Sequence, residues 1–332
     1  VTYGILTKDV SFAEYINGFF SPLLLLKLEF QDAQPFFSIK EYIKKQHSSI
    51  EANEIYQRLF FASEISKELR DSIIKWGVAH LFALSGFHLG LLGGMLFFIL
   101  YYPYTLLQKR FFRYRNRNFD LFFIIAFILF AYMIFVGTPA SLLRSFAMFL
   151  VGGLLYFRHV QILSFEFLGW VVLLLLAIFP ELFFDIGFWL SVGGVFYIYI
   201  FIRYFLHINK LAFVLWLNIY LFISMLPLAH LFFGVYSPYG LLSPFISIVF
   251  VVFYPLVMVL HALGLGGLLD SYLLAFFTLP DRAIDIKLPW YLFIIYGAVS
   301  LLAMYKKRAL WLQIALGTLF LLYLNVVFID SF

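Results

Sequence analysis

Two histidines and a serine lie within an otherwise apolar stretch, HLFALSGFHLGLLGG, which runs from His80 to Gly94. If the stretch is one helix, His80 and His88 fall on the same stripe and Ser85 lies at its flank. Ionisable groups are costly in lipid, so we expect these side chains to face protein or a water-filled passage. Two roles stay open: neutral imidazoles that bond backbone carbonyls, or polar groups that line a pathway.

The same stretch repeats glycine at every fourth position, at Gly86, Gly90 and Gly94. These glycines form a second stripe that lets a neighbouring helix approach closely, and we predict that they serve helix packing. His80 and His88 lie about 12 Å apart along a helix axis, too far for one zinc ion unless the helix breaks near Ser85. We therefore predict no metal site and no cofactor.

Two later segments carry charges where apolar residues are expected. The segment GTPASLLRS places Ser141 and Arg144 on one helix face, a short way below the predicted helix start at Pro139. A cation at that depth either snorkels to the head groups or faces a pathway for an anion. The segment DIGFWLS puts Asp185 at a helix N-cap, where it accepts backbone N–H bonds. An ion pair between Asp185 and Arg144 is the alternative.

Membrane helices must position these residues, because the chain is too apolar for a soluble protein. Apolar residues make up 64% of the 332 residues and charged residues only 12%, about half of the fraction usual in soluble domains. We predict an all-α polytopic membrane protein with about ten spans, some of them short or broken. The predicted spans are 76–107, 120–136, 139–157, 160–179, 186–205, 211–232, 240–262, 266–280, 290–305 and 309–328. The eighth is short and contains Asp270, so it either crosses or is re-entrant.

Residues 1–74 differ in composition, since they hold close to half of the acidic and basic residues. We predict that 1–74 form a small α+β head outside the membrane and that 75–332 form a transmembrane channel domain. Alternating residues in Ser21–Phe30 predict a strand, and capping patterns at Ser38 and Ser48 predict helix starts. The chain opens on Val1 without a cleavable signal peptide, so we expect further residues upstream.

Positive charge is distributed unevenly between the loops. Eleven basic residues fall in loops on one side of the predicted spans: Lys109, Arg110, Arg113, Arg115, Arg117, Arg158, Arg203, Lys210, Lys306, Lys307 and Arg308. The opposite loops hold only Arg282 and Lys287. Because positive loops stay in the cytoplasm, we predict the basic loops inside, with 109–117 as the main cytoplasmic basic loop, and the head outside.

Three segments together resemble the motifs of the ComEC-family competence proteins and occur in the family's order. The resemblance rests on GVAHLFALSGFHLG with His80, Ser85, Gly86 and His88, on GTPASLLRS with Ser141 and Arg144, and on DIGFWLS with Asp185, Phe188 and Ser191. A further segment, LPLAHLFFGVYSPYGLLSP, is similar to the family's later proline-rich segment. The resemblance extends from about Asn53 through the spans, and implies a short form without the metallo-β-lactamase-like nuclease domain of many members.

This resemblance implies an inner-membrane channel that passes single-stranded DNA into the cytoplasm during natural transformation, with the motif residues along the DNA pathway. The implied partners are single-stranded DNA, the lipid bilayer, an outer-side DNA receptor, and a cytoplasmic ATPase or single-strand-binding protein. No P-loop or nuclease motif occurs in the sequence, so we expect no enzyme. Two alternatives stay open: a proton-coupled small-solute secondary transporter, and an intramembrane metalloenzyme that uses His80, His88 and an acidic residue.

Overall fold

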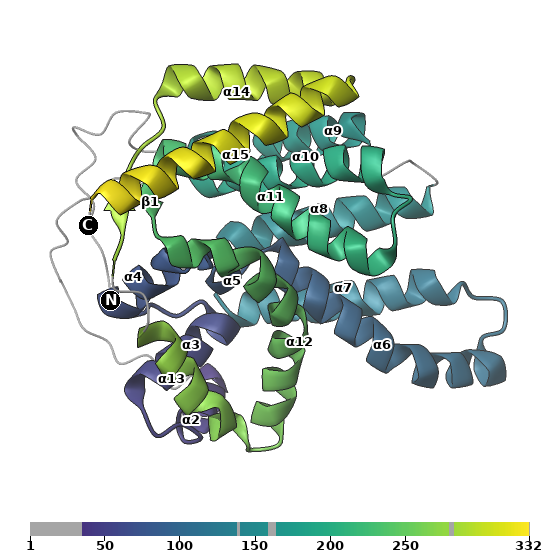
Figure 1. The fold of residues 1–332 in the computed structure, drawn as a ribbon. Helices are drawn as coiled ribbons and strands as arrows, with labels where there is room; N and C mark the ends of the chain where they lie inside the picture. The colour runs from purple at the N-terminus through teal and green to yellow at the C-terminus, as the bar shows by residue number, and fades with distance from the viewer. Residues whose placement is uncertain (1–34, 138–139, 159–163, 279–281, 332) are drawn as a thin grey trace, which may run out of the picture.

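The computed structural model describes residues 35–137, 140–158, 164–278 and 282–331, and these are almost entirely helical (Figure 1). The side chains of residues 35–38, 140 and 141 also fall outside the description. The predicted strand at Ser21–Phe30 and the capping side chain of Ser38 therefore lie outside the described part of the chain.

Four short helices precede the first long one: α2 (Pro35–Lys44), α3 (Ile50–Phe61), α4 (Lys67–Lys75) and α5 (Ala79–Phe82). The α3 helix is capped one residue later than predicted, because Ser49 rather than Ser48 accepts the backbone N–H of Ala52, at 3.1 Å. Apolar side chains of α3 and α4 belong to the same core cluster as those of the long helices that follow. The division after residue 74 into a head and a transmembrane domain stays a prediction.

Six long helices follow in series: α6 (Gly86–Phe111), α7 (Arg117–Phe135), α8 (Ala140–Phe157), α9 (Phe165–Ile178), α10 (Ile186–Phe205) and α11 (Lys210–Phe232). Four of them begin at a polar side chain that accepts backbone N–H groups of the first turn, namely Asn116, Ser164, Asp185 and Asn209. Between α9 and α10 the chain forms a 3-10 turn, η1 (Pro180–Phe184). From α7 onward these helices follow the predicted spans to within a few residues.

The last third of the chain is less regular. It contains η2 (Pro238–Leu242), α12 (Ser243–Ala262), η3 (Gly266–Leu269), α13 (Asp270–Thr278), α14 (Trp290–Ala303) and α15 (Lys307–Asp330). Two short strands, β1 (Val235–Tyr236) and β2 (Ile284–Asp285), pair antiparallel, so the segments that follow α11 and precede α14 lie side by side. In Figure 1 the second half of α12 runs across the direction that α6 and α7 share.

Six helical segments of the described chain are long and apolar enough to cross a membrane: α6, α7, α10, α11, η2 with α12, and α15. Three shorter apolar helices, α8, α9 and α14, accompany them. The nine residues of α13 measure about 13 Å, less than half of a hydrocarbon core of about 30 Å. The chain is a helical multi-pass membrane protein, and the predicted number of ten spans is not confirmed.

A buried polar network ties together the helices α11, α14 and α15. The side chain of Gln313 is fully buried and donates to Ser224 Oγ at 2.9 Å and to Tyr296 Oη at 3.0 Å. Tyr220 Oη donates to Gln313 Oε1 at 3.0 Å, and Tyr296 Oη donates to the carbonyl of Ser224 at 3.1 Å. Hydrogen bonds of this kind fix helix partners where water is absent, so the bundle is specified by polar contacts as well as by packing.

Candidate functional site

The stretch His80–Gly94 is not one helix, so that part of the prediction is wrong. The α5 helix ends at Phe82, the backbone of Ala83 is extended, and α6 begins at Gly86. Ser85 takes the N-cap position of α6, and its backbone N–H donates to His88 Nδ1 at 3.4 Å in a reciprocal capping arrangement. A serine cap satisfies N–H groups that a continuous helix would bond internally, which explains why the helix restarts here.

The break separates the environments of the two histidines. His88 is only 1% exposed, and its ring lies edge-on to the rings of Phe250 and Tyr254, at centroid distances of 5.4 and 5.0 Å. Its Nε2 finds no hydrogen-bond partner among the described residues. His80 is exposed, and its Nε2 lies 3.2 Å from Ser247 Oγ on α12. The two imidazoles therefore do not form the single polar stripe that helical spacing predicted.

The turn before α5 packs directly against the later proline-rich segment. Ser243 Oγ donates to the carbonyl of Gly77 at 2.9 Å. Gly77 has a φ of +66°, and a Cβ added there would lie 3.3 Å from the Cα of Gly240. Only glycine combines this left-handed conformation with such a close backbone approach. This contact was not predictable from spacing, because the two segments lie more than 160 residues apart.

Arg144 and Asp185 form an ion pair between α8 and the start of α10. The guanidinium donates from Nη1 to Asp185 Oδ2, while Asp185 Oδ1 accepts the backbone N–H of Gly187 at 2.7 Å and of Phe188 at 3.4 Å. Arg144 is only 8% exposed, so it does not snorkel to water. The two roles considered for Asp185, helix cap and counter-ion, thus occur together.

Three of the motif segments meet at this ion pair. A Cβ added to Gly86, the first residue of α6, would lie 3.2 Å from Ser145 Oγ on α8. A Cβ added to Gly187 would lie 3.3 Å from Arg144 Nη2. The α8 helix contacts both α6 and α10, which brings the three segments together. We call Gly86, Arg144, Ser145, Asp185 and Gly187 the motif junction.

The side chain of Phe188 lies in a core cluster, although its backbone N–H bonds to Asp185. Phe188 is buried beside Val171, Leu175 and Leu182, where it packs α10 against α9 and η1. Ser191 is exposed on α10. The side chain of Ser141 lies outside the described part of the chain, although its backbone belongs to α8. Phe188 therefore has a packing role in this arrangement.

The glycine stripe of α6 packs against another helix only at its start. A Cβ added at Gly90 or Gly94 would meet nothing within 4 Å among the described residues, whereas Gly86 lies against Ser145. Gly93, beside the stripe, contacts Leu129 of α7. Within the described chain, Gly86 therefore lies against a neighbouring helix, while the packing role of Gly90 and Gly94 stays a prediction.

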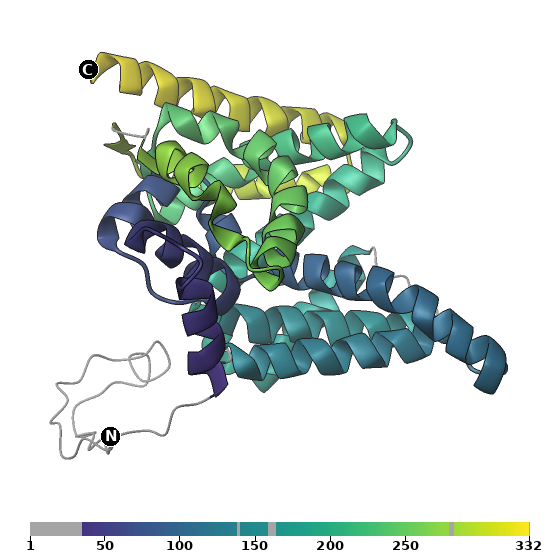
Figure 2. The same cartoon turned by 90° about the horizontal axis from the view of Figure 1, so that it is seen from below.

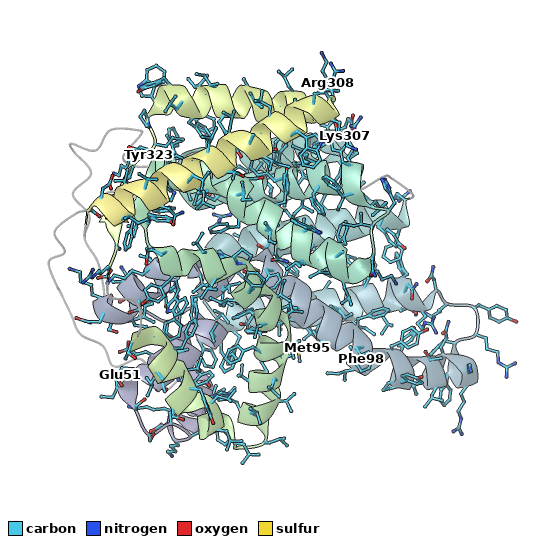
Figure 3. All side chains as sticks on the ribbon, viewed as in Figure 1. Glu51, Met95, Phe98, Lys307, Arg308 and Tyr323 are labelled. Carbon is cyan, nitrogen blue, oxygen red and sulfur yellow. The ribbon has the colours of Figure 1, made fainter. Side chains whose placement is uncertain are left out.

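The basic loop joins the ends of α6 and α7, and these two helices project beyond the rest of the chain (Figures 1 and 2). Arg115 donates two hydrogen bonds of 2.8 Å to Asp120, which raise the pKa of its guanidinium, and Arg117 lies 4.1 Å over the ring of Tyr101. Four basic side chains of the loop are exposed: Arg115 itself and also Lys109, Arg110 and Arg113. Figure 3 shows two further cations, Lys307 and Arg308, at the start of α15.

A cluster of ionisable residues that the sequence did not indicate lies away from the motif junction. His47 Nδ1 lies 3.0 and 3.1 Å from the two carboxylate oxygens of Asp270, and His47 Nε2 lies 3.1 Å from His261 Nε2. More than 210 residues separate His47 from each partner, so spacing carries no signal. Among the described residues, no three His, Cys, Asp or Glu side chains meet in an arrangement suited to a metal ion.

A family model described as "Competence protein" matches residues 61–329, which is most of the chain and includes all three motif segments. Comparison with curated proteins and with solved structures found no match. The matched region begins near the end of α3 and ends within α15, so it contains the motif junction and every long helix. The chain belongs to the competence protein family, as a ComEC-family member.

Proposed function

We propose that this chain is an inner-membrane channel that passes single-stranded DNA into the cytoplasm during natural transformation. Membership of the competence family supports a role in DNA uptake. The observation that carries the proposal further is the motif junction, where segments from α6, α8 and α10 meet at a buried arginine. A polyanion with one charge per nucleotide needs cationic groups along its path, and Arg144 is such a group within the membrane part.

Arg144 is not a free cation, and this constrains how it would act. Its charge is balanced by Asp185, so a phosphate would have to replace the carboxylate as its partner. The Asp185 side chain is 34% exposed, which leaves one side of the pair open to competition, whereas Arg144 itself is almost buried. We therefore propose that the pair opens when a strand arrives, with Asp185 remaining as the cap of α10.

The orientation follows from the loop charges. The exposed cations Lys109, Arg110 and Arg113 are placed in the cytoplasm, where they would receive the strand, and the N-terminal helices are placed outside. Exposed His80 lies on the outer side in this arrangement and buried His88 contributes packing. An outer DNA receptor would deliver the substrate, and a cytoplasmic ATPase or single-strand-binding protein would supply the pull, with no enzymatic step in this chain.

Replacement of Arg144 by glutamine tests the proposal. In transformable cells that carry Arg144→Gln at normal membrane levels, labelled DNA should bind the surface as before while entry to the cytoplasm falls. The loss of one charge-assisted hydrogen bond is worth about 1.5–3 kcal/mol, so we expect a decrease of about tenfold or more. Arg158→Gln, at the exposed opposite end of the same helix, is the matched control and should leave entry unchanged. Normal entry with Arg144→Gln would remove Arg144 from the pathway.

A further inference from the structure

The turn between α12 and α13 is bonded to the turn between α2 and α3. Gln46 Nε2 donates to the carbonyl of His261 at 3.1 Å, and Gln46 Oε1 accepts the backbone N–H of Gly266 at 2.8 Å. A Cβ added to Gly267 would lie 2.4 Å from the carbonyl oxygen of Gln46. These contacts involve backbone on both sides, so the two turns lie at the same depth relative to any membrane.

The histidine cluster strengthens this connection. His261 Nδ1 lies 2.6 Å from the carbonyl of Val257, which can only accept, so this nitrogen carries the hydrogen. His261 Nε2 is then the acceptor for His47 Nε2–H, and the other ring nitrogen of His47 faces Asp270. The three side chains of His261, His47 and Asp270 therefore form one continuous chain of hydrogen bonds. The His47 side chain is fully buried, so this is an interior contact and not a chance surface pairing.

The ring of Tyr56 covers the cluster from α3. It stacks on His47 with a centroid distance of 4.6 Å and meets His261 edge-on at 4.5 Å. Burial, and then the negative charge of Asp270, raise the pKa of the Tyr56 hydroxyl, which keeps this ring neutral. The α2–α3 turn, α3, α12 and α13 therefore meet at one packed interface.

The strand pairing fixes where the α12–α13 segment begins and ends. Val235 of β1 lies opposite Asp285 of β2, and α4 packs beside both β1 and η2. The chain between β1 and β2 thus starts and finishes on the side of α4. It either crosses the membrane twice, through α12 and α13, or does not cross it. Two crossings would put the α12–α13 turn on the side of the membrane away from α4. This turn is instead bonded to Gln46 and His47, and α13 contacts α3 and α4, so two crossings do not fit.

We infer that α12 does not cross the membrane, in spite of its length and apolar composition. It lies along the membrane on the side of the N-terminal helices, and the chain crosses eight times, through α6 to α11, α14 and α15. The direction of the second half of α12 in Figure 1, across α6 and α7, agrees with this placement. The shortness of α13, about 13 Å, agrees as well, because it offers no second crossing.

Lipid acyl chains of the adjacent leaflet cover the outer face of α12. One stripe of the helix is buried in the protein core: Phe250, Tyr254, Val257 and His261. The opposite stripe, at spacings of three and four residues, consists of exposed large apolar side chains: Phe245, Val249, Val252, Leu256, Val259 and Leu263. A stripe of this size is stable against hydrocarbon and not against water, so the helix rests at the boundary of the leaflet.

Cysteine labelling tests the inference, because the sequence contains no cysteine. Leu265→Cys places a thiol in the exposed α12–α13 turn, and Leu268→Cys is a second variant in case the first does not fold. Glu64→Cys, between α3 and α4, marks the side of the N-terminal helices, and Tyr114→Cys, in the fully exposed basic loop, marks the opposite side. Each variant is treated with a membrane-impermeant maleimide, first in intact cells and then after permeabilisation.

We expect the thiols at 265 and 268 to be labelled under the same condition as Glu64→Cys and under the opposite condition to Tyr114→Cys. Labelling together with Tyr114→Cys would overturn the inference, and so would a lack of labelling under both conditions, because a turn at the membrane surface is wet. The comparison is relative to the two markers. It therefore stands whichever side proves cytoplasmic, and it does not depend on DNA transport.

Discussion

The Arg144–Asp185 pair is expected to hold α8 against the start of α10, and Asp185→Asn isolates its charge. Asparagine is as good an N-cap as aspartate, so the bonds to the N–H groups of Gly187 and Phe188 are retained. The substitution removes only the counter-charge of a guanidinium that is 8% exposed. The variant therefore contains a buried, unpaired cation.

The size of the effect follows from the exposure of the two partners. Removing one member of a buried ion pair costs about 3–5 kcal/mol. Because the Asp185 side chain is 34% exposed, water screens part of the interaction, and we reduce the figure to about 2 kcal/mol. For a chain of 332 residues, a loss of that size lowers the Tm by about 3 °C.

Thermal unfolding of the purified protein in detergent measures this change for Asp185→Asn, Arg144→Gln and the double variant. The double variant has no unpaired charge, so it should be no less stable than Asp185→Asn, and the two single effects should not add. Glu181→Gln, an exposed carboxylate four residues upstream, is the control and should leave the Tm unchanged. Additive single effects, or a Tm unchanged by Asp185→Asn, would refute the idea that the pair contributes to stability.

Two further substitutions test the packing of the membrane helices and the histidine cluster. Gly153→Ala should destabilise the contact of α8 with α7 by about 1–3 kcal/mol, because a Cβ there would lie 2.0 Å from a ring carbon of Phe122. Gly94→Ala is the control: a Cβ there meets no atom within 4 Å, so the Tm should stay unchanged or rise. His47→Gln should lower the free energy of unfolding by about 3 kcal/mol, because it leaves the buried carboxylate of Asp270, 6% exposed, without its partner. Adding Asp270→Asn should recover much of this loss. Failure to recover it would contradict the pairing of His47 with Asp270.

The sequence was sufficient to predict most helix positions, because many of the long apolar runs begin at a polar cap or next to a charged loop. Asn116, Ser164 and Asn209 are examples, and each begins a helix close to a predicted boundary. The break at Ser85 was harder to predict, since apolar residues continue on both sides and helical spacing gives no indication that a serine will cap. The local pattern therefore determined the type of element, while the interruption coincides with the reciprocal capping of Ser85 and His88.

Contacts between distant segments were predictable only where two opposite charges lay at equivalent depths. Arg144 and Asp185 satisfied this condition, so their pairing was among the alternatives considered. The histidine cluster did not satisfy it, because the sequence places His47 in the predicted head and places His261 and Asp270 in two separate predicted spans. The sequence alone supports α12 as a crossing helix equally well, since length and hydropathy do not distinguish a helix that spans the bilayer from one that lies on it.

The polar groups of the membrane part differ in how completely they are bonded, and this difference indicates where water would enter. In the bundle of α11, α14 and α15, the amide of Gln313 has partners for its oxygen and its nitrogen, so opening this bundle to water would break bonds already made. Near the motif junction, His88 Nε2 is buried and has no partner among the described residues, which costs about 1–3 kcal/mol unless a polar group reaches it. Under the proposed function, water is therefore expected to reach the motif junction beside His88, and not the interior of the Gln313 bundle.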